Sequence, residues 1–242
     1  MKQGHFYFIK DEFINKYGTG NNLMQNKETI NGQAHQRPCF LAFSDAKNPD
    51  VFWCVPISSR LEKYHRLYDD KIARQEAQGK LNPKCTTIRF GNVLGQERAF
   101  LVQNMFPCID KYVESTYIDR NTKNEVTVEP EVMKDVVNSA KDVLRMEERG
   151  VKLVFTDVKS LYNAMENELQ QEKEAIAQEA APDESNNKTN QEQEESEDPE
   201  ADSPDEPEGN LDYVKAYGER MAELNADESS APMPEKELDL DL

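Results

Sequence analysis

The sequence predicts an α+β domain in which a small twisted β-barrel is decorated with helices, followed by an acidic tail. Three observations predict this arrangement. Short apolar runs of strand length, rich in aromatic and β-branched residues, recur through the first 110 residues. A longer segment, 129–149, has apolar residues at helical spacing. Beyond Gln170 the chain has few residues that could build a core.

The first predicted elements are a strand and a short helix. His5–Ile9 is an aromatic run of strand length, and apolar residues then follow at helical spacing up to Gly18. Residues 19–34 are polar and rich in Asn, Gly and Gln, which predicts a loop. We expect this loop to deliver the chain to a strand that begins at Arg37.

Two apolar runs within 39–57 predict a β-hairpin, because the segment between them, 44–50, is short, polar and contains a proline. Arg37 precedes the first run, and Ser58 and Ser59 end the second. The hairpin would bring these side chains to the same end of the sheet, as a functional site requires. A solvated strand-edge arginine and two turn serines would give the same pattern without any chemistry.

The main basic region follows the serines and extends over 60–84. Cations and aromatic rings alternate there, which favours a surface that follows an RNA backbone and stacks on bases; a solvated helix face is the alternative. The candidates for this surface are Tyr64, His65, Arg66 and Lys71. Tyr7 in the first strand is a further candidate for stacking or phosphate binding, although a packed aromatic ring explains it equally well.

Three more strand-length runs follow: 86–91, 98–103 and 105–109. The helix over 129–149 is flanked by Pro130, which suits a first helical turn, and by Gly150, which suits a C-terminal cap. Val151–Phe155 predicts a last strand, and a terminal helix follows it as far as Pro182.

Charge divides the chain. Residues 1–170 contain 24 Lys and Arg against 23 Asp and Glu, whereas 171–242 contain 5 against 24, so the net charge of −18 belongs to the tail. We expect a folded domain over 1–165 and, over 166–242, a helical extension and a disordered acidic segment. The tail could compete with RNA for basic side chains, or it could only favour solubility; 211–224 could form a short amphipathic helix.

The remaining composition narrows the class of protein. The four cysteines show no CxxC pairing and three of them lie in apolar runs, so we expect buried reduced thiols and a cytoplasmic protein. The three histidines have no metal-ligand spacing, and we expect neither a metal nor a cofactor. No apolar stretch approaches the roughly 18 residues of a membrane span, and no signal-peptide core follows the first residues.

Several segments, taken in order, carry a family resemblance: Phe6–Lys10, Arg37–Phe40, Val55–Ser59 with Lys63–Tyr64, Ala99–Pro107 and Gly150–Val158. They resemble the ToxN/AbiQ endoribonuclease toxins of type III toxin–antitoxin systems, most closely the CptN-like branch, and more distantly the MazF/PemK toxins. The resemblance spans about residues 1–165.

The resemblance implies an SH3-like barrel of the MazF/Kid type that cleaves single-stranded RNA without a metal, leaving 2′,3′-cyclic phosphate ends. The substrate would be cellular or phage mRNA. A small RNA antitoxin made of tandem repeats would inhibit the toxin in a closed toxin–RNA oligomer. Neither DNA nor a membrane would be a partner.

This chain departs from the family pattern at two positions. The type III members carry a lysine where Arg37 stands, and another close behind the hydroxyl pair, whereas Lys63 lies four residues after Ser59. We assign Arg37 to stabilisation of the negative charge of the transition state, and Lys63 to phosphate binding or proton donation. Ser59, and secondarily Ser58, would hydrogen-bond the phosphate or the 2′-hydroxyl.

His35 is the candidate for proton transfer, because imidazole titrates near neutrality; a loop histidine without a role is the alternative. Two other functions stay open. The chain could be a non-catalytic barrel that binds RNA or protein, or a MazF/PemK-type toxin with a protein antitoxin.

Overall fold

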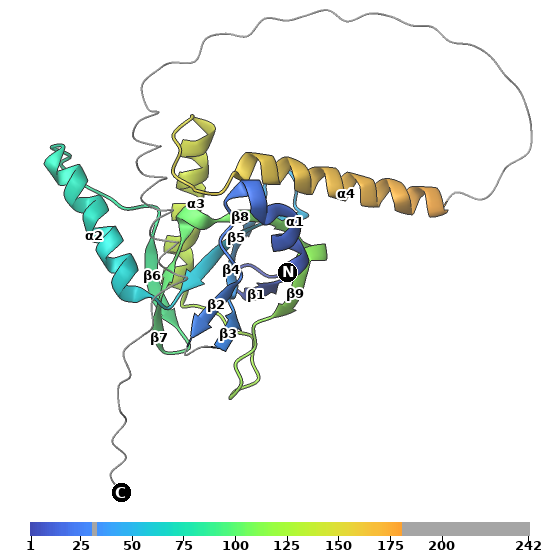
Figure 1. Ribbon diagram of the computed structural model, residues 1–242, viewed down its shortest axis with the longest axis horizontal. Helices are drawn as coiled ribbons and strands as arrows, with labels where there is room; N and C mark the ends of the chain where they lie inside the picture. The colour runs from blue at the N-terminus through green and yellow to red at the C-terminus, as the bar shows by residue number, and fades with distance from the viewer. Residues whose placement is uncertain (31–32, 181–242) are drawn as a thin grey trace, which may run out of the picture. The chain divides into compact units, whose positions relative to one another are not determined.

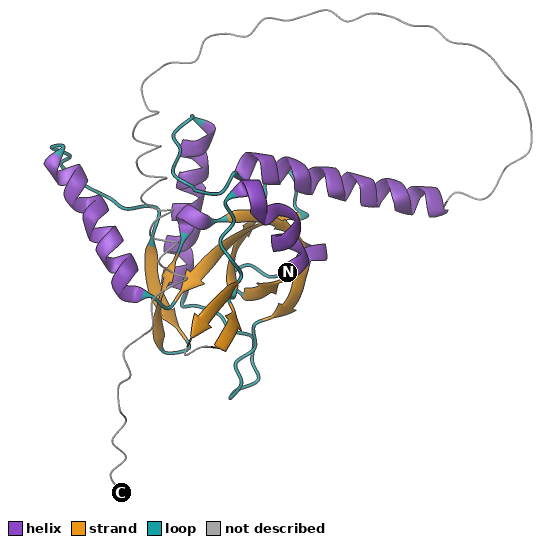
Figure 2. Ribbon diagram, in the orientation of Figure 1, coloured by secondary structure: helices purple, strands orange, loops and turns teal. Residues whose placement is uncertain are grey.

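The computed structural model describes residues 1–30 and 33–180, which build an antiparallel sheet flanked by helices (Figure 1, Figure 2). The strands of this sheet are β1 (Phe6–Ile9), β4 (Cys39–Ser44), β5 (Val51–Ser58), β6 (Arg89–Val93), β7 (Gln96–Phe100), β8 (Phe106–Ile109) and β9 (Val113–Thr116). Their hydrogen-bonded order is β6-β7-β5-β4-β1-β9, and β8 pairs with β5. The predicted mixture of helices and antiparallel strands is confirmed.

The sheet is open within the residues that the structure describes, so the finer prediction of an SH3-like barrel is not confirmed and stays a prediction. Within the described residues, β6 and β9 stand at the two ends of the pairing order and no ladder joins them. β9 is only four residues long, and beyond Tyr117 the chain folds back on itself, so that Ile118 pairs with Glu125 in an isolated bridge. β5 pairs with β8 along its first half and with β7 at its last two residues, Ile57 and Ser58.

The β4–β5 hairpin forms as predicted and lies in the middle of the sheet. Cys39 pairs with Pro56, which places the beginning of β4 beside the end of β5. The Asp45 carboxylate fixes the connecting loop because it accepts hydrogen bonds from Trp53 Nε1 at 3.0 Å and from the Tyr162 hydroxyl at 2.9 Å. The hairpin is therefore tied to the C-terminal part of the domain.

The described residues contain four α-helices and two 3-10 turns: α1 (Asp11–Asn21), α2 (Leu61–Ala77), η1 (Val102–Asn104), η2 (Asp110–Tyr112), α3 (Pro130–Glu148) and α4 (Val158–Ala180). The helix predicted over 129–149 is confirmed, with Pro130 in its first turn and Gly150 following it at a φ of +81°. Figure 1 shows α2 and the end of α4 extending beyond the strands.

The core lies mainly between α3 and the sheet. Phe40 packs against Phe6 and Phe100 with ring centroids 5.4 Å apart in both pairs. The α3 side chains Val136 and Ala140 are fully buried in the same cluster. Burial of this apolar stripe, at roughly 25 cal/mol per Å², holds the helix on the sheet. The sheet can then present its strand ends at fixed positions.

The loop predicted over 19–34 is in part a small hairpin of two strands, β2 (Lys27–Ile30) and β3 (Gln33–Gln36). Their sequences are polar and contain neither an apolar run nor a clear alternation, which are the signals of a strand. The hairpin carries the chain to the beginning of β4.

Two other predictions of strands are wrong. The run 98–103 leaves the sheet after Phe100, and Val151–Phe155 forms no strand. In the second segment the backbone N–H groups of Leu153 and Val154 donate to Oε1 of Glu147, at 2.9 Å for Val154. A side chain at the end of α3 thus supplies the acceptor that a neighbouring strand would have supplied.

The four cysteines are buried and form no disulfide, as predicted. No helix of the described residues is long and apolar enough to cross a membrane. Residues 181–242 lie outside the described residues. The predictions of an acidic disordered tail and of a helix over 211–224 therefore stay predictions.

Candidate active site

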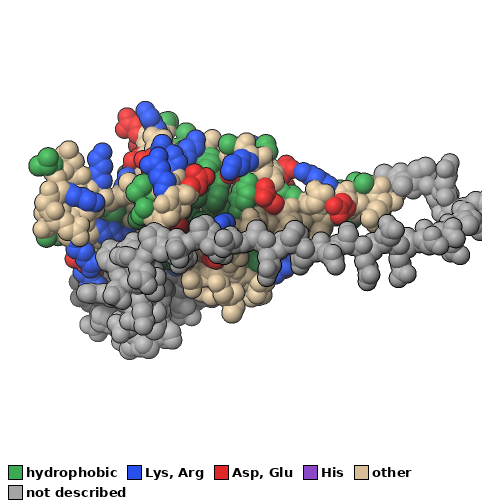
Figure 3. Space-filling model, turned by 90° about the horizontal axis from the view of Figure 1, so that it is seen from above, with side chains coloured by type: hydrophobic (Ala, Val, Ile, Leu, Met, Phe, Trp, Pro, Cys, Tyr) green, Lys and Arg blue, Asp and Glu red, His purple; other side chains and the backbone are tan. Residues whose placement is uncertain are grey.

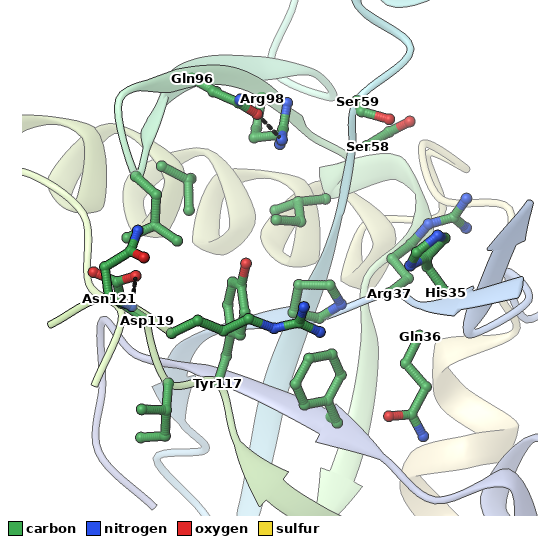
Figure 4. Close-up of a pocket in the computed structure, with 17 residues that line it drawn as sticks. His35, Gln36, Arg37, Ser58, Ser59, Gln96, Arg98, Tyr117, Asp119 and Asn121 are labelled. Carbon is green, nitrogen blue, oxygen red and sulfur yellow. Dashed lines mark hydrogen bonds between the residues drawn. The ribbon is translucent and has the colours of Figure 1, made fainter. Parts of the chain in front are cut away.

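A pocket of about 830 Å³ opens at the end of the sheet where β4 begins and β5 ends (Figure 4). His35, Arg37, Ser58 and Ser59, all singled out in the sequence, line it. The turn between β6 and β7 lines it from one edge of the sheet, and residues 117–121 line it from the other. The two edges of the open sheet thus contribute to one pocket.

Arg37 is held in place by the segment that precedes β2. Its side chain is 5 % exposed, and Nη1 donates a hydrogen bond to the carbonyl oxygen of Gln25 at 2.9 Å. Its backbone N–H donates to the carbonyl oxygen of Asn26. The Asn26 amide in turn donates to the Ile9 carbonyl oxygen at 3.1 Å and to Asp11 at 2.8 Å. The guanidinium is therefore fixed by the fold, which suits the binding of one anionic group.

The two serines differ in exposure. Ser58 is the last residue of β5, is 2 % exposed, and its Oγ accepts a hydrogen bond from the backbone N–H of Arg60 at 3.2 Å. Ser59 is exposed, and its carbonyl oxygen accepts from the N–H of Leu61 where α2 begins. Ser58 shapes the turn, whereas Ser59 presents its hydroxyl at the surface.

His35 enters the pocket from β3, an element that the sequence did not predict. Its ring is exposed, and Figure 4 shows it beside Arg37. The next residue, Gln36, donates from Nε2 to Glu114 at 2.6 Å, which ties the end of β3 to β9. An accessible imidazole beside a fixed guanidinium is an arrangement that can move a proton close to a bound phosphate.

The cations predicted behind the serines lie on α2 and do not line the pocket. Lys63 is half-buried, with Nζ 5.7 Å from the centre of the Tyr64 ring. The His65 ring stacks on Phe90 at 3.9 Å. Arg66 is exposed.

Neither Tyr7 nor Tyr64 is placed to stack on a base, because they are 5 % and 4 % exposed. The Tyr7 hydroxyl accepts a hydrogen bond from the backbone N–H of Lys2 at 2.7 Å. Tyr7 therefore fits its alternative of a packed aromatic ring. The Tyr64 ring is also packed in the core, which neither reading of the basic region predicted. Phe8, the neighbour of Tyr7, lines the pocket instead.

Lys71 is also an internal group, in contrast to the predicted RNA contact. Its ammonium donates hydrogen bonds to Thr87 Oγ1 at 2.6 Å and to Gln103 Oε1 at 2.7 Å. Burial lowers the pKa of Lys71 to about 8. The two bonds attach α2 to the segments around β6 and η1, so Lys71 serves the packing of this helix.

The residues on the far side of the pocket were not predicted from the sequence; they include Arg98, Tyr117, Arg120 and Asn121. Arg98 belongs to a segment predicted as a strand, and the others belong to a polar stretch without periodicity. A concentration of arginine and asparagine in a short turn was the signal that could have pointed to them.

Positive side chains dominate this pocket. Arg37, Arg98 and Arg120 line it together with a single carboxylate, Asp119. Hydrogen bonds from the backbone N–H of Asn121 and from Thr122 hold the pKa of Asp119 below its ordinary value. These bonds engage both carboxylate oxygens in the turn. The remaining lining suits an anion such as a phosphate group.

Within residues 1–30 and 33–180, no group of three or more His, Cys, Asp or Glu side chains is arranged to hold a metal ion. Asp119 is the acidic residue that lines the pocket, and its carboxylate accepts hydrogen bonds from Asn121 and Thr122 in the same turn.

No family model and no curated protein matches the chain. Among solved structures, the fold is similar to that of AbiQ, a lactococcal anti-phage endoribonuclease belonging to the type III toxin–antitoxin system. The TM-score is 0.48 and the sequence identity is 13 %, over 70 % of this chain and 99 % of the AbiQ chain. At this identity, the chemistry of the present chain has to be argued from its own residues.

Proposed function

We propose that this protein is an endoribonuclease toxin of a type III toxin–antitoxin system. It would cleave single-stranded RNA by attack of the ribose 2′-oxygen on the adjacent phosphorus, without a metal. The observation that carries the proposal is the meeting of His35 and Arg37, from β3 and its connection to β4, with Ser59, from the end of β5, at one pocket.

Cleavage of this kind requires stabilisation of the negative charge that develops on the phosphorane. Arg37 is the group for this role, because its guanidinium is permanently charged and fixed by the Gln25 carbonyl oxygen. A fixed cation costs little reorganisation when the charge develops, which is why a buried arginine suits the transition state better than a mobile one.

The reaction also moves two protons, one from the 2′-hydroxyl and one to the leaving 5′-oxygen. His35 can take up or supply such a proton, since it is exposed beside Arg37. Ser59 would hydrogen-bond the phosphate or the 2′-hydroxyl. Lys63 lies on α2 behind the serines and has at most a supporting role in binding the RNA backbone.

The finer parts of the proposal are supported by the sequence resemblance. They are an SH3-like arrangement of the strands, an inhibitor RNA of tandem repeats, a closed toxin–RNA oligomer, and action on cellular or phage mRNA in the cytoplasm. Arg66 and Arg74 are exposed on α2 and are available for contacts with the RNA backbone outside the pocket.

The test is incubation of the purified protein with a single-stranded RNA in excess EDTA, followed by mapping of the cut sites and end groups. We expect 2′,3′-cyclic phosphate and 5′-hydroxyl ends. Arg37→Ala, His35→Ala and Ser59→Ala should each lower the rate, by roughly 10²–10⁴-fold for a group that transfers a proton.

Two control variants carry the same kinds of substitution at positions outside the pocket. Arg149→Ala removes an exposed arginine that follows α3, and Ser160→Ala removes an exposed serine of α4. Both should cleave like the unaltered protein. Intact RNA with a folded protein that still binds it would favour the non-catalytic RNA-binding module. Cleavage that EDTA abolishes would exclude the metal-free mechanism.

A further inference from the structure

The pocket has a second end whose side chains are of a different kind. Figure 4 places Asp119 and Asn121 on the opposite side of the pocket from His35 and Arg37, with Tyr117 between them. Leu94 and Ile118 line the same pocket and are 49 % and 39 % exposed. The whole pocket has a volume of about 830 Å³, in the range of pockets for small organic ligands, so it has room for more than a phosphate group.

The apolar side chains of this end are held there by the backbone. Leu94 has a φ of +52° and Gly95 a φ of +75°, as in the tight turn that joins two antiparallel strands. A leucine rarely adopts this conformation, and such local strain tends to occur at functional positions. The turn keeps the Leu94 side chain at the rim of the pocket, where about half of it stays exposed.

The opposite rim is equally well fixed. The carboxylate of Asp119 accepts hydrogen bonds from the backbone N–H of Asn121 at 3.0 Å and from the Thr122 hydroxyl at 2.7 Å. Its backbone N–H donates to the carbonyl oxygen of Asn124 at 2.9 Å, and its carbonyl oxygen accepts from the N–H of Lys123 at 2.9 Å. Asp119 is thus a positioning residue that holds Asn121 at the pocket.

Between the two rims the wall is aromatic. Phe8 and Tyr117 are half-buried and meet edge to face, with ring centroids 5.4 Å apart. Aromatic and apolar surfaces contact the face of an unstacked base, whereas amide groups bind its edge. Aromatic and apolar surfaces contribute little to the binding of a phosphate, so their presence beside the arginines indicates a ligand that has an apolar part as well as a phosphate.

We propose that this end of the pocket binds the nucleobase next to the scissile phosphate and so sets the nucleotide preference of cleavage. Leu94 and Ile118 contact the face of the base, and Asn121 hydrogen-bonds its edge. The inference rests on the proposed ribonuclease function, but it concerns binding, so it can be tested separately from the chemistry.

The first experiment maps the cut sites of the protein in a pool of random-sequence single-stranded RNA. Asn121→Ala and Ile118→Ala should reduce the preference for the favoured nucleotide at one position beside the cut by roughly 5- to 150-fold, the range of one lost base contact. Arg37→Ala should slow all cuts alike and leave the preference unchanged. Asn124→Ala is the matched control, because it removes an exposed asparagine from the same turn outside the pocket.

The second experiment measures binding of nine-nucleotide oligomers of U, A and C, by fluorescence anisotropy in EDTA. If the protein cleaves no RNA but Asn121→Ala changes its relative affinity for the three oligomers, the base-binding inference holds and the proposed function fails. If Asn121→Ala and Ile118→Ala both keep the original preference in cleavage and in binding, the inference is overturned, whatever the outcome for cleavage.

Discussion

Replacement of Glu168 by glutamine tests how α4 is attached to the domain. Glu168 is 7 % exposed, and its carboxylate accepts hydrogen bonds from the Tyr112 hydroxyl at 2.6 and 2.7 Å, from Lys16 at 2.5 Å and from Lys111 at 3.1 Å. The Tyr17 hydroxyl also donates to it. This cluster joins α4 to α1 and to the segment around η2.

The free energy can be worked out from the pKa of Glu168. Burial opposes ionisation, but the hydrogen bonds from Lys16, Tyr112, Tyr17 and Lys111 outweigh it and hold the pKa at about 2, against an ordinary value of 4.5. A shift of this size corresponds to about 3 kcal/mol. Since the two lysines are 51 % and 42 % exposed, water screens part of the interaction, and we expect a loss of about 2 kcal/mol for Glu168→Gln at pH 7.

The dependence on pH has a definite sign. The folded-state pKa lies below the unfolded-state pKa, so the unfolded chain binds more protons as the pH falls below about 4.5. The stabilisation is therefore complete above pH 5 and is lost as the pH falls toward 2. The difference between the unaltered protein and Glu168→Gln should shrink over this range.

Urea denaturation at several pH values measures both the loss of stability in Glu168→Gln and its dependence on pH. In thermal unfolding, Tm should fall by roughly 2–4 °C for each kcal/mol lost. Glu172→Gln is the control, because Glu172 contacts Lys111 at 3.1 Å but is 43 % exposed, and exposed pairs contribute less than about 1 kcal/mol. Equal stability of Glu168→Gln and the unaltered protein at pH 7 would refute the reasoning. A difference in stability between the two proteins that stays constant from pH 5 to pH 2 would refute it as well.

Three further predictions concern other parts of the chain. As the pH rises from about 8 to about 10.4, the unaltered protein should gain stability relative to Lys71→Met. Burial lowers the pKa of Lys71, so over this range the unfolded chain keeps a proton that the folded protein has lost. Urea denaturation across this range checks the sign. Gly91→Ala should cost about 1–3 kcal/mol, because the new Cβ would collide with Val132, and Val132→Ala in the same chain should recover much of the loss; additive losses would contradict this. Removal of residues 181–242 should tighten the binding of single-stranded RNA and change its salt dependence, because the segment is strongly acidic; titrations at two salt concentrations that agree with those of the full chain would exclude competition by the tail.

The parts of the fold that the sequence predicted are those with strong periodicity or clear punctuation. The α3 helix combines apolar residues at helical spacing with Pro130 at its start and Gly150 after its end. The β4–β5 hairpin joins two apolar runs through a polar turn. Because hairpin register follows from such a turn, the meeting of Arg37 and the two serines could be predicted as well.

The rest depended on contacts that no local pattern records. β2 and β3 are polar strands that pair only with each other in the described residues, so no apolar stripe marks them. Val151–Phe155 has the composition of a strand, but the Glu147 side chain takes its N–H groups. Residues 117–121 line the pocket because they follow β9, which stands at one end of the sheet. The position of β9 in the strand order depends on pairing between distant segments and cannot be seen in the local sequence.

The distribution of charge decides how such a pocket could select RNA. Residues 1–170 are almost neutral, and Figure 3 shows Lys and Arg side chains mixed with Asp and Glu over one face of the described part. Long-range attraction of a polyanion by this part is therefore weak, and salt screens it within about 10 Å. Attraction has to come from Arg37, Arg98 and Arg120 at short range. An RNA strand would bind where one of its phosphates contacts these arginines and one of its bases contacts Asn121. Such a base has to be unpaired, so a duplex is disfavoured.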